Sequence, residues 1–134
     1  MSEPGDTDTS PPQRVQVLPA GATAAEALER VGRSLGWHVA RIDLEGCTDK
    51  QELLGRTAAA LDFPDWFGAN WDALYDCLAD LGWRPAPGHL LVFECSSALR
   101  RAAPEVRDTA VAILEDAAAA WASRGVPFRA VLLD

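Results

Sequence analysis

Cysteine and histidine are scarce in this sequence, which limits the kinds of site it can build. Its three cysteines, Cys47, Cys77 and Cys95, are odd in number and lack the Cys-x-x-Cys spacing of metal and redox sites. We expect them to be buried, reduced thiols rather than a disulfide framework or a zinc site. His38 and His89 belong to no catalytic or metal-ligand pattern, and His89 is expected in a loop or at a sheet edge. No cofactor or metal is expected.

Positive charge is also in short supply. The sequence has 12 lysines and arginines and 20 acidic residues, which gives a formal net charge of -8. Such a balance argues against a surface that neutralises nucleic-acid phosphates and favours a basic protein partner. Acidity alone is equally typical of proteins whose charge only keeps them soluble, so charge is informative where it clusters.

Long apolar runs are absent, and so are the basic and apolar regions of a signal peptide. No run approaches the ~20 apolar residues that a membrane span requires. We therefore expect a cytoplasmic protein with no membrane partner and no direct contact with nucleic acid.

The 134 residues are enough for one domain with a tail. Residues 1–13 contain no apolar residue after Met1 and are expected to form a disordered tail. Residues 14–37 are expected to form an N-terminal β-α extension, with a strand over 15–18 and a helix opened by a capping box at Thr23. Residues 38–134 form the main domain.

Strands and helices alternate along the main domain. Residues 38–44, 90–94 and 128–133 have the apolar, strand-like character of sheet segments, and 104–123 has helical periodicity. Alternation of this kind implies parallel pairing through helical crossovers. The predicted fold is a small α/β domain in three layers. Its parallel sheet has three strands, or four if 15–18 joins, and helices pack against it.

Two further helices are delimited by their caps. Thr48 opens a second capping-box pattern, and the helix behind it ends before Pro64. Asn70 is a good N-cap for a helix over 71–81, which Gly82 is expected to end.

The helix over 71–81 carries a row of carboxylates. Asp72, Asp76 and Asp80 recur at every fourth position and line one ridge about 12 Å long. We call these three residues the acidic ridge. The other side of the helix carries the apolar residues that must face the core: Leu74, Cys77, Leu78 and Leu81.

A solvated helix face explains the acidic ridge only in part. Asp72 interacts favourably with the macrodipole near the helix N-terminus, but Asp76 and Asp80 repel their neighbours without a lysine or arginine in the helix to offset them. Trp71 and Tyr75 flank the ridge and offer contact area suited to an interface. On the residues alone, a functional surface and a plain solvated face stay evenly matched.

Residues 65–78 resemble the signature of the barstar family of ribonuclease inhibitors. They read aromatic-aromatic-Gly-x-Asn-x-Asp-Ala-Leu-aromatic-Asp at the family's spacing, and a weaker likeness extends over 39–133. The resemblance implies a barstar-like fold and an intracellular inhibitor, of the toxin-immunity kind, of a secreted basic ribonuclease similar to barnase. The acidic helix and the loop before it would enter the active-site cleft of the nuclease.

The resemblance also implies which residues bind the partner. Asp76 would take the place of a substrate phosphate among the basic groups of the nuclease, and Asp72 would make a second charge contact. The remaining positions that match or align with family contacts are Trp66, Asn70, Trp71, Tyr75, Asp80, Gly82 and Trp83.

Three departures from the family pattern accompany the match. A partner-contacting glutamate of the last family helix aligns with Ala120, and Asp116 stands one turn earlier. The loop after Leu78 is longer than in the family. Residues 1–37 have no counterpart in barstar.

Two other functions compete with inhibition. An enzyme is disfavoured, because an exposed ridge of carboxylates offers neither a cleft nor a perturbed acid-base pair. A binding module of the same fold with a different basic protein partner remains an alternative.

Overall fold

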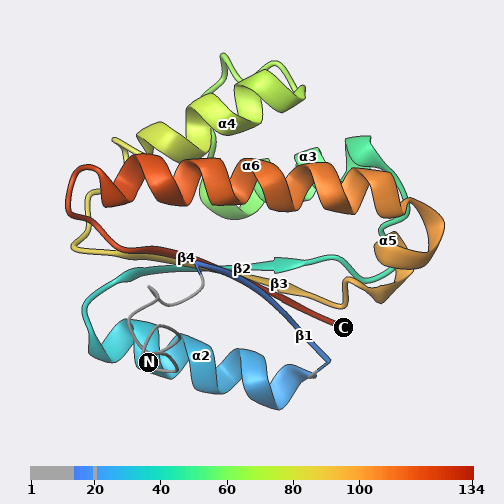
Figure 1. The fold of residues 1–134 in the computed structure, drawn as a ribbon, viewed down its shortest axis with the longest axis horizontal. Coiled ribbons are helices and arrows are strands. Elements are labelled where there is room, and N and C mark those ends of the chain that lie inside the picture. The colour runs from blue at the N-terminus through green and yellow to red at the C-terminus, as the bar shows by residue number, and fades with distance from the viewer. Residues whose placement is uncertain (1–13, 20) are drawn as a thin grey trace, which may run out of the picture.

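The computed structural model describes residues 14–19 and 21–134, which form an α/β fold around one parallel sheet (Figure 1). The tail expected over residues 1–13 lies outside the described residues. The elements are β1 (Val15–Leu18), α2 (Ala22–Ser34), β2 (His38–Asp43), α3 (Lys50–Leu61), α4 (Trp71–Asp80), β3 (His89–Glu94), α5 (Ser97–Ala102), α6 (Pro104–Ala122) and β4 (Phe128–Leu133).

The sheet has four strands in the order β1-β4-β3-β2, and every pairing is parallel. β3 and β4 are the inner strands, and both are almost wholly buried, as expected for a parallel sheet covered on two faces. The N-terminal strand joins through the register Val15↔Ala130, which confirms the fourth strand. A boundary between an extension and a main domain at residue 37 stays a prediction.

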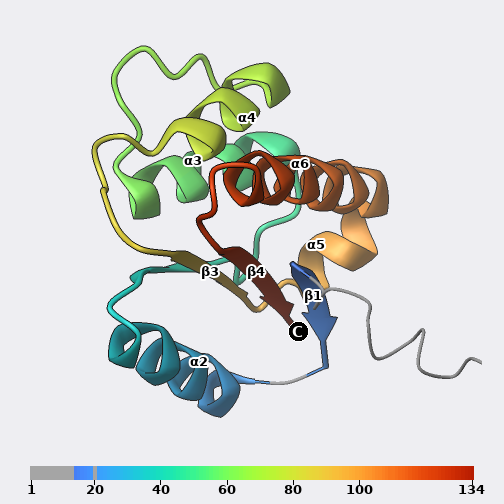
Figure 2. The same ribbon diagram turned by 60° about the vertical axis from the view of Figure 1, so that its left-hand side comes forward.

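Helices cover both faces of the sheet. Figures 1 and 2 show α2 on one face and α3, α4 and α6 on the other. Side chains of β3 alternate between the two cores: Leu91 and Phe93 join the larger one beneath α6, and Leu90 and Val92 join the smaller one beneath α2. α6 lies against β4, and α4 packs on α6 as an outer layer.

The helix starts differ in part from expectation. The capping box predicted at Thr23 is wrong, because α2 begins at Ala22 after Gly21 with no side-chain cap. At α3, Asp49 and not Thr48 is the N-cap, and its carboxylate accepts a hydrogen bond from the Glu52 amide at 2.8 Å. A carboxylate caps at least as well as a hydroxyl, so the cap moves by one residue.

α4 begins as expected and ends one residue early. The Asn70 side chain accepts a hydrogen bond from the Ala73 amide at 2.8 Å, which confirms it as the N-cap. At the other end Leu81, not Gly82, adopts the left-handed conformation, with φ 44°. That conformation costs about 1–2 kcal/mol for a side-chain-bearing residue, and complete burial of the leucine offsets it.

The region after β3 contains two features that the sequence did not predict. The short helix α5 was not predicted, because six residues carry too little periodicity to stand out. The expectation that all three cysteines are buried is wrong for Cys95, which is exposed at a left-handed turn with φ 59°. Cys47 and Cys77 are buried and reduced, as expected.

The expectation that His89 lies in a loop or at an edge is wrong. It is the first residue of the inner strand β3, is 1% exposed and lies 4.8 Å from the Trp121 ring centroid. Its Nδ1 is 3.0 Å from Nδ1 of His38 on the paired strand, so one neutral ring donates to the other. Burial, with a smaller contribution from His38, lowers the pKa of His89 to about 4.

This buried histidine makes the fold sensitive to acid. Below pH 6.5 the unfolded chain binds a proton at His89 that the folded chain rejects until about pH 4, so stability falls as pH falls through this window. We expect the free energy of unfolding to drop by about 2 kcal/mol between pH 7.5 and pH 5. Urea titrations at each pH measure it. His89→Gln should flatten this slope, and an unchanged slope in the variant would contradict the assignment.

Candidate functional site

The loop before α4 and the first turns of α4 form one surface. The loop spans residues 62–70, and Ala69 takes a left-handed conformation with φ 53° immediately before the Asn70 cap. The cap holds the first turn of α4, where Asp72 benefits from the positive end of the helix dipole. The Asn70 cap, a local feature of the sequence, therefore fixes where the helix begins.

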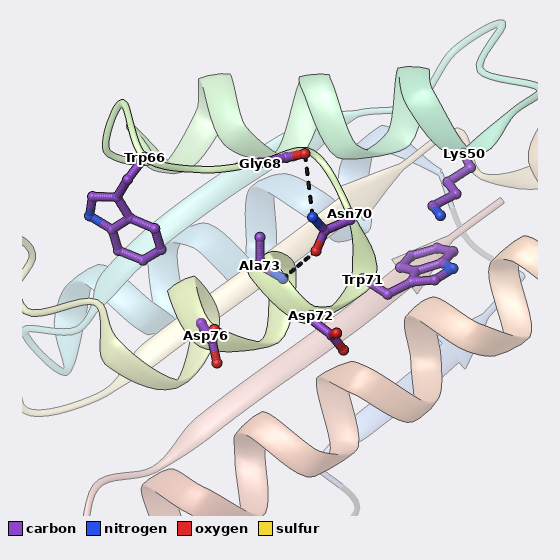
Figure 3. A pocket seen from close by; sticks show the side chains of 8 residues that line it. All are labelled: Lys50, Trp66, Gly68, Asn70, Trp71, Asp72, Ala73 and Asp76. Carbon is purple, nitrogen blue, oxygen red and sulfur yellow. Dashed lines mark hydrogen bonds between the residues drawn. The ribbon is translucent and has the colours of Figure 1, made fainter.

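This surface is hollowed into an open groove of about 580 Å³. Figure 3 shows Asp72 and Asp76 side by side on α4, with Trp66 on the loop above them. Trp66 is 58% exposed, unusually open for so large an apolar side chain. The full lining is Lys50, Trp66, Gly68, Asn70, Trp71, Asp72, Ala73 and Asp76.

Lys50 is a groove residue that sequence reasoning missed. It is the first residue of α3, and its Nζ lies 5.0 Å from the centroid of the Trp71 ring, within cation–π range (Figure 3). No local signal marks Lys50, because its partner lies 21 positions away and the two meet only through the packing of α3 beside the loop. It brings one positive charge to the edge of an otherwise acidic groove.

Tyr75 lies outside this groove, in a second hollow of about 460 Å³ between α4 and α6. Asp116, Ala119 and Ala120 of α6 line the rest of it. Asp116 and Ala120, the two positions at issue for the missing last-helix glutamate, thus lie on one surface beside Tyr75. The surface offers a carboxylate there even though Ala120 cannot.

Asp80, Gly82 and Trp83 line neither hollow. Asp80 is exposed at the last turn of α4, and a Cβ at Gly82 would lie 3.1 Å from its Oδ1. Trp83 is half-buried and donates from Nε1 to the Leu61 carbonyl at 3.0 Å, which caps the end of α3. The acidic ridge is therefore split, with two of its three carboxylates in the groove. A role for these three residues in binding stays a prediction.

The inner side of α4 is held by α6. Leu74, Cys77 and Leu78 are buried as predicted, and Trp121 donates from Nε1 to the Leu78 carbonyl at 2.8 Å. Arg124, which lies just after the end of α6, also donates to the Ala79 carbonyl in the last turn of α4, where a cation is favoured by the helix dipole. The turn that follows α6 thus supplies the positive charge that α4 itself lacks.

Cys77, the thiol of α4, is buried in the core and is not open to the groove. Burial and the negative charges of Asp76 and Asp80 raise the pKa of the Cys77 thiol to about 11, so it is no nucleophile at neutral pH. Within residues 14–19 and 21–134, no group of three or more His, Cys, Asp or Glu side chains is placed to hold a metal. Nor does any helix of this part have the length and apolarity to cross a membrane.

Comparison with known proteins agrees with this geometry. The family model described as Barstar (barnase inhibitor) matches residues 37–133, which include β2 to β4 and both hollows. A comparison with curated protein sequences finds no match. Membership of the matched family implies a barnase-like ribonuclease as the partner. The chain belongs to the barstar (barnase inhibitor) family, whose proteins are inhibitors and not enzymes.

Proposed function

We propose that this chain is an intracellular inhibitor of a secreted, basic ribonuclease and that its acidic groove covers the active site of that enzyme. The observation that carries the proposal is the pair Asp72 and Asp76, which share one hollow with the exposed Trp66. Neither carboxylate has an ion pair or a side-chain hydrogen bond within the described part of the chain. Their charge is available to a partner.

The groove is complementary to a site that binds RNA phosphates. Such a site presents arginine, lysine and histidine side chains, and a carboxylate can accept from an arginine fork through two parallel hydrogen bonds. Asp76 is the proposed phosphate mimic, and Asp72, one helical turn away, is the second charge contact. Trp66 and Trp71 supply aromatic contact area around the charges, the kind of residue enriched in the centre of protein interfaces.

The hollow between α4 and α6 supports a second contact region. Tyr75 and Asp116 offer an aromatic ring and a carboxylate from two different helices. We assign Asp116 the part of the glutamate that the family carries near Ala120. The surface of this chain that binds the nuclease would then extend from Trp66 in the loop, across α4, to α6.

A binding module for another basic protein is the second candidate, and Lys50 is the observation that favours it. A lysine at the edge of the groove repels a partner that is basic throughout and suits one with a carboxylate at that point. The two candidates separate in one assay: an inhibitor suppresses RNA cleavage by a barnase-type ribonuclease at stoichiometric concentration, and an unrelated binding module does not.

Asp76→Ala should abolish most of the inhibition. Removing the central carboxylate strands the basic groups of the nuclease without a counter-charge, which costs roughly 3 kcal/mol or more and weakens Kd at least a hundredfold. Titration calorimetry and RNA cleavage assays measure both effects. The matched control is Glu26→Ala, an exposed acid on α2 on the other face of the sheet, which should change Kd less than twofold. Equal, small losses in the two variants would place the interface elsewhere.

Association with the nuclease should slow steeply with salt. The attraction between exposed charges is screened over about 8 Å at physiological ionic strength, so electrostatic steering fades as salt rises. We expect the association rate constant to fall by about tenfold or more between 20 mM and 500 mM NaCl, with a smaller change in the dissociation rate constant. Stopped-flow fluorescence of the tryptophans in the groove measures both. A rate that does not depend on salt would exclude capture by charge.

A further inference from the structure

A second groove lies on the other face of the sheet, between α2 and the strands β1 and β4. Its volume is about 270 Å³, and its walls are mainly apolar, with Leu28, Val31 and Leu35 on the helix side. The groove exists because α2 packs chiefly on β2 and β3 and leaves the neighbouring pair of strands less covered. Its helix wall, residues 28–35, lies outside the stretch matched by the barstar family.

The helix wall of this groove exposes large apolar side chains to solvent. Val31 is 57% exposed and Leu35 is 54% exposed, two of the four large apolar side chains that the described residues leave exposed. They are one helical turn apart and line the same hollow as Trp37 and Val131. Exposed apolar side chains that cluster in a groove are typical of a binding site.

Two arginines line the sheet side of the groove. Arg14 directly precedes β1, and its carbonyl accepts a hydrogen bond from the Ala130 amide of β4 at 2.8 Å. This contact puts Arg14 beside Arg129, at the spacing of neighbouring strands in a parallel sheet, about 4.8 Å. Like charges placed side by side across strands destabilise a sheet. Arg129 donates to the Phe128 carbonyl at 3.2 Å, and neither arginine has a carboxylate partner among residues 14–19 and 21–134.

Another arginine on the same face shows the contrast. Arg41 of β2 donates to Glu94 at 2.8 Å and to Glu29 of α2 at 3.0 Å, so its charge is neutralised by two carboxylates. In a chain of net charge -8, acids are available to pair with arginines. The pair Arg14 and Arg129 departs from this pattern at the place where the apolar groove opens.

We propose that this groove binds a small amphiphile with a carboxylate head and an apolar tail. The head accepts from the guanidinium groups of Arg14 and Arg129 and removes their repulsion, as the arginine fork matches a carboxylate in geometry. The tail lies along Leu28, Val31 and Leu35. The volume of about 270 Å³ is just below the roughly 300–1,000 Å³ typical of ligand pockets and suits a tail of medium length. The site is on the face away from α4 and is independent of nuclease inhibition.

Decanoate is the probe, titrated into the full chain with methyl and arginine side-chain NMR as the readout. Decanoate should shift the Val31 and Leu35 methyl signals and the Arg14 and Arg129 side-chain signals in a saturable way. Decanol, which has the same tail and no charge, should bind at least about tenfold more weakly, because each charge-assisted hydrogen bond contributes substantially to binding. Equal affinity for the two probes, or no saturable shift, overturns the proposal.

Variants separate the head from the tail. Arg129→Gln should weaken the affinity for decanoate about tenfold or more and leave the affinity for decanol unchanged. The variant would then no longer prefer the acid over the alcohol. Val31→Ser, at an exposed position that tolerates change, should weaken both probes. The matched control is Arg101→Gln, an exposed arginine on α5, which should leave both affinities unchanged. If Arg101→Gln weakened decanoate as much as Arg129→Gln does, the loss would come from the change in net charge alone, and the proposed site would be overturned.

A second copy of the chain is the competing occupant. Spectra without probe, recorded over a hundredfold range of protein concentration, should keep the Val31 and Leu35 signals in place. Shifts of these signals on dilution, together with a rising sedimentation coefficient at high concentration, would show self-association through the groove and overturn the proposal.

Discussion

Helix α6 is the element on which the position of the acidic helix depends. α4 rests on α6, and α6 in turn lies on the sheet. Buried alanines at 110, 117 and 118 keep the surface of α6 low enough for close packing. At its C-terminal end Trp121 ties the last turn of α4 through the Leu78 carbonyl, and the same ring covers His89 of the inner strand. Trp121 thus links the helix that carries the acidic groove directly to the core of the sheet.

Both ends of α4 are held by residues in a left-handed conformation that are not glycines. Ala69 precedes the Asn70 cap with φ 53°, and Leu81 ends the helix with φ 44°. Such conformations persist only where the surroundings over-determine them. For Leu81 the surroundings are the core, in which it is wholly buried. A helix restrained at both ends presents Asp72 and Asp76 without first having to be ordered, and pre-organisation of this kind favours affinity.

The two grooves on opposite faces of the sheet carry opposite local charge despite the acidic total. The carboxylates of Asp72 and Asp76 line the groove on α4, and two neighbouring arginines line the groove beneath α2. Each groove pairs its charges with exposed apolar or aromatic side chains, Trp66 in one case and Val31 with Leu35 in the other. The sheet separates them, so that occupation of one groove leaves the other accessible.

The sequence by itself determined the alternation of strands and helices, the Asn70 cap, and the division of α4 into a buried stripe and a carboxylate ridge. These features depend on residues a few positions apart, whose geometry follows from helix and strand periodicity. It also carried the family resemblance. It did not determine which ridge residues share a hollow.

Only the tertiary structure decided the contacts between distant segments. Lys50 lies against Trp71, Tyr75 and Asp116 line one hollow, and Arg14 lies beside Arg129. His89 became a buried inner-strand residue because strand order, not local polarity, sets its surroundings. Each of these pairs is more than 20 residues apart along the chain or depends on a strand order that no local pattern encodes. Packing energy summed over the whole core selects them, and no short window of sequence contains that sum.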